Sequence, residues 1–132
     1  MRVAAVRQML TTPAAEFDPT LPGLFAGDPP IEFVALLEQI AAAVRPHSLE
    51  TQLPVMADAD QRDLLPHIAV PTLLIWGELD VRSPLSVAHQ FAQAIPDTTL
   101  VVIPDCGHVS NLEAPYEGND AIRDFCRARP PR

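Results

Sequence analysis

The sequence predicts an α/β fold with parallel strands, and three observations lead to it. Two short runs, "TLLIW" (72–76) and "TTLVVI" (98–103), are largely apolar on both faces, as expected of strands buried inside a parallel sheet. Proline and glycine residues bound these runs. A segment with helical periodicity follows each run. Residues 70–128 are therefore predicted to form strand, helix, strand and helix, with the two strands parallel and adjacent.

Each helix of this unit has an apolar stripe. The segment "PLSVAHQFAQAI" (84–95) has proline at its start, where a helix tolerates it, and one face formed by Leu85, Ala88, Phe91 and Ile95. The last helix is expected from Pro115 to Arg127, with Ile122 and Phe125 facing inward. Both helices are thus expected to cover the sheet.

The amino-terminal half is predicted to be helical and interrupted by proline. Residues 3–10 form a short amphipathic segment, and the proline-rich stretch 11–30 is expected to be loop. The segment "IEFVALLEQIAAAV" (31–44) has apolar residues at helical spacing. A second helical stretch, "SLETQLPVMADAD" (48–60), contains Pro54 and is therefore short or kinked.

Composition excludes several function classes. With 132 residues and 48% hydrophobic residues, the chain is long enough for one domain with a core. The formal charge is −8 and no basic patch occurs, which argues against nucleic acid as a partner. No apolar run approaches the roughly 20 residues that span a membrane, so no membrane association is expected.

The sequence predicts neither a disulfide framework nor a metal site. Cys106 and Cys126 are its two cysteines, and the former is expected to be a small buried residue. His47, His67 and His89 lack the spacing of metal ligands. No cofactor is expected, and a reducing, cytoplasmic location is the default interpretation.

Polar residues follow both predicted strands. The first strand ends in "GELD" and the second in "IPDCGH", which carry Asp80 and His108. The carboxyl ends of neighbouring parallel strands lie at the same edge of a sheet, so these residues are expected to be close in space. A carboxylate that accepts the Nδ1 proton of an imidazole fixes its tautomer and leaves Nε2 as a general base. Ser110, two residues further on, is expected to cap the next turn.

These two stretches resemble a known family. "VPTLLIWGELDVRSP" followed by "IPDCGHVSNLEAP" is similar to the carboxyl-terminal part of an α/β-hydrolase. In that family a Gly-x-x-Asp turn carries the acid of a catalytic triad, a Gly-His pair carries the base, and a Glu-x-Pro leads into the last helix. Asp80, His108, Glu113 and Pro115 match these positions. The resemblance implies a partial α/β-hydrolase fold: a helical cap-like segment over residues 1–65, then the last two parallel strands with flanking helices over residues 66–132.

The resemblance also implies a nucleophile upstream of the acid. Residues 1–79 contain no Gly-x-Ser-x-Gly motif, and none of the five glycines frames a nucleophile elbow. The chain is therefore expected to supply the acid, Asp80, and the base, His108, for hydrolysis of a small ester, lactone or related substrate, and to be inactive alone. The substrate class stays open, because serine nucleophiles indicate esterases or lactonases and aspartates indicate epoxide hydrolases or dehalogenases.

Two other interpretations remain: a non-catalytic interaction module and an inactive remnant. The first strand is expected to present an unpaired edge to sheet that this chain does not encode. The expected partners are thus a small-molecule substrate, once an amino-terminal half completes the site, and either a separate amino-terminal chain or a second copy of this chain.

Overall fold

The computed structural model describes residues 23–43, 51, 52, 54, 55 and 59–129. The chain divides into two compact units, one made of residues 1–21 and 29–61 and the other of residues 22–28 and 62–132. The short segment 22–28 thus belongs with the carboxyl-terminal unit, although residues 29–61 separate it from that unit in sequence. The assignment of residues 1–65 to a cap stays a prediction.

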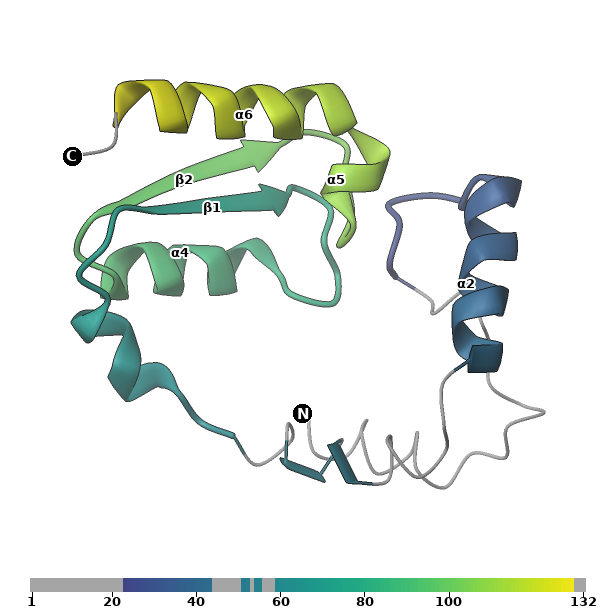
Figure 1. Ribbon diagram of the computed structural model, residues 1–132, viewed down its shortest axis with the longest axis horizontal. Helices are drawn as coiled ribbons and strands as arrows, with labels where there is room; N and C mark the ends of the chain where they lie inside the picture. The colour runs from purple at the N-terminus through teal and green to yellow at the C-terminus, as the bar shows by residue number, and fades with distance from the viewer. Residues whose placement is uncertain (1–22, 44–50, 53, 56–58, 130–132) are drawn as a thin grey trace. The chain divides into compact units, whose positions relative to one another are not determined.

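The first unit contains helix α2, Ile31–Ala43 (Figure 1). The helix begins after Pro30, whose carbonyl oxygen accepts hydrogen bonds from the backbone N–H groups of Phe33 and Val34. Val34 and Leu37 are half-buried, whereas Ile31 and Ile40 are exposed. The predicted helix at 3–10 and most of the predicted stretch at 48–60 lie outside the described residues.

The second unit has the predicted order of strand, helix, strand and helix. A 3-10 helix, η2 (Arg62–His67), leads into β1 (Thr72–Gly77), α4 (Leu85–Ala94), β2 (Thr98–Ile103), the short α5 (Ser110–Glu113) and α6 (Pro115–Ala128). The strands are parallel, with Leu74 opposite Leu100 and Gly77 opposite Ile103. The expected α/β fold class is confirmed for this unit.

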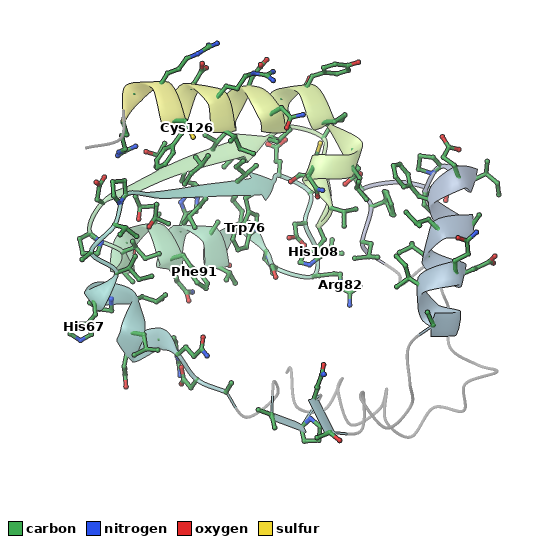
Figure 2. All side chains as sticks on the ribbon, viewed as in Figure 1. His67, Trp76, Arg82, Phe91, His108 and Cys126 are labelled. Carbon is green, nitrogen blue, oxygen red and sulfur yellow. The ribbon has the colours of Figure 1, made fainter. Side chains whose placement is uncertain are left out.

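Helices α4 and α6 cover opposite faces of this sheet (Figure 1). Because side chains alternate along a strand, Trp76 faces α4, and its ring centroid lies 6.3 Å from that of Phe91. Figure 2 labels both residues. Ile103 faces α6, and its Cδ1 lies next to Gly118. The buried apolar residues among the described part of the unit belong to these layers and the loop after β2: Ala88, Ile95, Ile103 and Cys106.

One residue that the sequence predicts to face the core is exposed in the structure. Ile122 of α6 is 48% exposed, whereas Phe125 is half-buried as expected. Ile122 lies near Ile75 on the β1 side of the sheet, where the described residues provide no further strand. The outer edge of β1 therefore has no strand partner among the described residues. Within the described part of the chain, no helix combines the length and apolarity needed to cross a bilayer.

Candidate active site

The turns that follow β1 and β2 are hydrogen-bonded to each other. The backbone N–H of Glu78 donates to the carbonyl oxygen of Ile103 at 2.9 Å, and that of Leu79 donates to the carbonyl of Cys106 at 2.8 Å. Gly77 makes this approach possible, because a Cβ there would collide with the carbonyl oxygens of Cys106 and Gly107. The glycine of the "GELD" motif therefore lets the two strand ends meet.

Asp80 is held by backbone donors of its own loop. Its Oδ1 accepts hydrogen bonds from the N–H of Arg82 at 2.9 Å and of Ser83 at 2.8 Å. Ser83 is fixed in turn, since its carbonyl oxygen accepts the indole N–H of Trp76 at 2.7 Å. Asp80 is buried, with 6% of its surface exposed. The loop thus orients this carboxylate and leaves Oδ2 for a further partner.

That partner is His108. Its Nδ1 lies 2.9 Å from Asp80 Oδ2, as expected from the parallel strands. A carboxylate only accepts hydrogen bonds, so Nδ1 carries the proton and Nε2 of the neutral ring holds a free lone pair. The His108 side chain is 40% exposed, whereas that of Asp80 is 4% exposed. In Figure 2, His108 lies beyond the carboxyl ends of both strands. The pair combines a shielded carboxylate with an accessible imidazole.

The loop that carries His108 departs from regular backbone at Asp105, which has φ of 56°. This left-handed conformation is one that aspartate adopts more readily than most residues. Cys106 follows and is buried, with 4% of its surface exposed. Burial raises the pKa of the Cys106 thiol, and the negative charges of Glu113, Glu117 and Asp105 raise it further. Cys106 is therefore a packing residue, as predicted, and not a thiolate nucleophile.

Glu113 binds the histidine loop, a contact that the sequence did not reveal. Its Oε2 accepts the backbone N–H of Gly107 at 2.6 Å, and its Oε1 accepts the N–H of Ala26 at 2.7 Å. In the sequence, Glu113 belongs to a motif, but no local pattern assigns it a contact. Likewise, nothing in the sequence indicates that residues 23–28 contact this loop, because Ala26 and its partner Glu113 are 87 positions apart.

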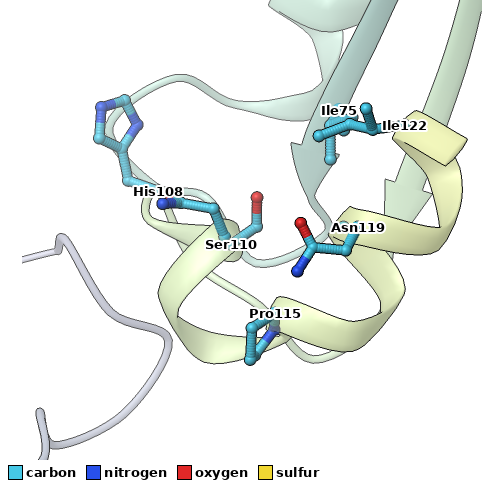
Figure 3. Close-up of a pocket in the computed structure, with 8 residues that line it drawn as sticks. Ile75, His108, Ser110, Pro115, Asn119 and Ile122 are labelled. Carbon is cyan, nitrogen blue, oxygen red and sulfur yellow. The ribbon is translucent and has the colours of Figure 1, made fainter.

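A hollow of about 240 Å³ lies next to the histidine loop, between β1 and the helices α5 and α6 (Figure 3). In Figure 3 the His108 ring points away from the side chains of Ser110 and Asn119, so neither is placed to exchange a proton with it. The N-cap residue of α5 is Val109 and Ser110 is the first residue of the helix itself, so the predicted cap at Ser110 is wrong. The lining residues are Ile75, His108, Ser110, Asn111, Pro115, Gly118, Asn119 and Ile122.

Comparison with known proteins places this geometry in a family. The family model described as alpha/beta hydrolase fold matches residues 33–115, a range that includes both Asp80 and His108. The chain belongs to the α/β-hydrolase fold family. Membership explains the order of strand, helix and turn motifs in the second unit, and it confirms the resemblance carried by the "GELD" and "CGH" turns.

Relatives of this hydrolase-family chain include named esterases. A pimeloyl-[acyl-carrier protein] methyl ester esterase of Aromatoleum aromaticum is 36% identical over 83 residues, which are 63% of this chain and 33% of that protein. The corresponding enzyme of Vibrio parahaemolyticus is 33% identical over 82 residues, 62% of this chain and 32% of that protein. The chain therefore spans about a third of the length of these curated relatives.

Solved structures share the fold over nearly the whole chain. A thermophilic esterase from Thermogutta terrifontis has a TM-score of 0.74 and 28% identity, and the match covers 96% of this chain and 48% of that one. An esterase from Exiguobacterium antarcticum has a TM-score of 0.79 at 20% identity, covering 96% of this chain and 47% of that one. The second likeness concerns the fold alone.

Proposed function

We propose that this chain supplies the acid and the base of a catalytic triad that hydrolyses a carboxylic ester. The observation that carries the proposal is the 2.9 Å contact between Asp80 Oδ2 and His108 Nδ1, with the imidazole accessible at the carboxyl edge of the sheet. A buried carboxylate holds the ring in one tautomer and stabilises the imidazolium that forms during proton transfer. Both roles fit the surroundings of Asp80.

The reaction needs a nucleophile that these 132 residues do not provide in an elbow motif. Nε2 of His108 takes the proton of the nucleophile as its oxygen attacks the ester carbonyl. The new carbon–oxygen bond forms, the bond to the alcohol oxygen breaks, and His108 gives the proton to the departing alcohol. Water then releases the acid by the same route. In this proposal the nucleophile comes from polypeptide outside this sequence.

Two observations favour an ester over the other substrates that the family permits. The curated relatives at 33–36% identity are named methyl ester esterases, and the structure at 28% identity is an esterase. Each match covers less than half of the other protein, so the activity of these relatives supports a proposal for this chain and does not establish it. An ester of a carboxylic acid is the substrate class that this support indicates.

A chimera tests the proposal. In the esterase of Aromatoleum aromaticum, the part that aligns with this chain is replaced by this chain, and hydrolysis of p-nitrophenyl acetate is measured. We expect His108→Ala to lower kcat by about a thousandfold or more, as loss of a triad base does. His89→Ala is the matched control, since His89 is exposed on α4, and it should leave the rate unchanged.

A chimera that melts cooperatively and hydrolyses the ester equally well with and without the His108→Ala substitution would contradict the proposal. A folded chimera with no activity at all would favour the alternative, a non-catalytic interaction module. In that case the outer edge of β1 is the surface to examine for binding.

A further inference from the structure

We propose that Glu113 is a positioning residue that joins residues 23–28 to the loop of His108, so that the two form a brace around the acid–base pair. The inference rests on the proposed function for its catalytic meaning, but its structural content stands on separate contacts. Both hydrogen bonds of the Glu113 carboxylate go to backbone N–H groups, those of Ala26 and Gly107, so we place its effect in the backbone of the loop.

The hydrogen bonds on either side of His108 form a closed circuit. On one side, the N–H of Gly107 donates to Glu113 Oε2 at 2.6 Å. On the other side, the N–H of Val109 donates to the carbonyl oxygen of Leu24 at 3.0 Å. The circuit closes because the N–H of Ala26 donates to Glu113 Oε1 at 2.7 Å. Both backbone neighbours of His108 are therefore anchored, one by Glu113 and one by residues 23–28.

Close packing shows that residues 23–28 lie directly against both turns of the site. A Cβ at Gly107 would lie 2.6 Å from the backbone nitrogen of Ala26 and 2.7 Å from the carbonyl carbon of Phe25. At Gly23, where φ is 82°, a Cβ would lie 2.8 Å from Val81 in the loop of Asp80. The segment thus touches the base loop at one end and the acid loop at the other, within one compact unit.

The chemistry of Glu113 fits this task. A carboxylate offers two acceptor oxygens, and here each oxygen receives one backbone N–H. A glutamine of the same size keeps one acceptor and places an NH₂ donor against the other N–H. One of the two hydrogen bonds is then lost, and the loop and the segment separate. His108 would spend less time at hydrogen-bond distance from Asp80, which lowers kcat and leaves substrate binding unchanged.

Hydrogen exchange of the 132-residue chain tests the brace without any need for activity. In Glu113→Gln, we expect the amide of Gly107 or of Ala26, whichever faces the new NH₂ group, to exchange about tenfold faster, because its charge-assisted hydrogen bond is lost. Amides of β2 serve as the internal reference for a folded unit. Glu117→Gln is the matched control, since Glu117 is exposed in the first turn of α6, also lies near Cys106, and loses the same charge.

Unchanged exchange at both amides in a folded Glu113→Gln protein would overturn the proposal. If that variant does not fold, Ala26→Pro removes one donor of the circuit and leaves Glu113 in place. We then expect faster exchange at Val109, and unchanged exchange there would overturn the proposal equally.

The chimera separates this inference from the proposed function. There, Glu113→Gln should lower kcat about tenfold with KM unchanged, whereas Glu117→Gln should change neither. Suppose that exchange is faster in the isolated chain but that His108→Ala does not change hydrolysis by the chimera. The brace would then exist, and the proposed hydrolysis would not. Unchanged exchange together with hydrolysis that depends on His108 would mean that the proposed hydrolysis takes place and the brace does not exist.

Discussion

Gly77 shows, at the scale of a single residue, how the sequence brings acid and base together. Its missing side chain lets the turn after β1 lie against the carbonyl oxygens of Cys106 and Gly107. The hydrogen bond from Leu79 to Cys106 and the contact between Asp80 and His108 both depend on this approach. The polar contacts of the site therefore depend on the absence of a side chain at Gly77.

Gly77→Ala should destabilise the chain by about 3 kcal/mol, since its methyl group forces two backbone segments apart. Gly27→Ala is the control, because a Cβ at Gly27 meets nothing within 4 Å. It should change stability by less than about 0.5 kcal/mol. Urea unfolding followed by the fluorescence of Trp76 measures both. Equal stability of the two variants would show that the turns do not need this approach.

The two cysteines should differ sharply in reactivity. Cys126 is exposed and Cys106 is buried with a raised pKa, so Cys106 holds less thiolate near pH 8 and its sulfur is shielded. With Ellman's reagent, the Cys106→Ala variant, which keeps Cys126, should react fast. The Cys126→Ala variant, which keeps Cys106, should react at least about a hundredfold more slowly. Raising the pH should speed the slow reaction, because more thiolate forms. Equal rates for the two variants in the folded state would contradict the described burial.

Helix α6 illustrates what the sequence predicts well and what it does not at the scale of an element. A proline start and an apolar stripe, which are local signals, predict a helix from Pro115 to Arg127, and the observed helix, Pro115–Ala128, ends one residue later. The exposure of Ile122 was not predictable, because it depends on which strand lies beside β1. In the same way, parallel topology predicted the contact of Asp80 with His108, whereas nothing local marked Glu113 or Ala26 as partners.

Gly118 lowers the stability of the same helix, and a substitution there can raise it. A glycine inside a helix costs roughly 0.5–1 kcal/mol relative to alanine. At Gly118 a Cβ would meet only Ile103 Cδ1, at 4.0 Å, which is ordinary van der Waals contact. Gly118→Ala should therefore raise the free energy of unfolding by roughly 0.5–1 kcal/mol. A fall in the urea midpoint would mean that α6 packs more tightly on the sheet than described.

The whole molecule leaves one sheet edge open in its described part. The described sheet has two strands, and Leu73, Leu74 and Ile75 of β1 are only half-buried. An unpaired strand next to apolar side chains favours pairing with another chain. The chain also spans about a third of its curated relatives. These features support the proposal that β1 pairs with further sheet, supplied by other hydrolase polypeptide or by a second copy.

Light scattering should accordingly detect a dimer or a larger species when this 132-residue chain is studied alone at about 10 μM, with a mass that rises with concentration. Ile75→Lys should reduce the association, because a charge on a strand edge opposes pairing. The matched substitution Gln90→Lys adds the same charge at an exposed position of α4 and should have little effect. A monodisperse monomer with a cooperative melt would mean that this chain covers the edge itself.

Substitution of the acid tests the central claim most directly, because Asp80→Asn preserves shape while removing the acceptor that selects the tautomer of His108. In the chimera, kcat for p-nitrophenyl acetate should fall by about 10⁴ in Asp80→Asn, while the melting temperature stays close to that of the parent chimera. Asp124→Asn, on the exposed face of α6, should leave kcat unchanged. A kcat in Asp80→Asn within tenfold of the parent chimera would contradict the assignment of Asp80 and His108 as an acid–base pair.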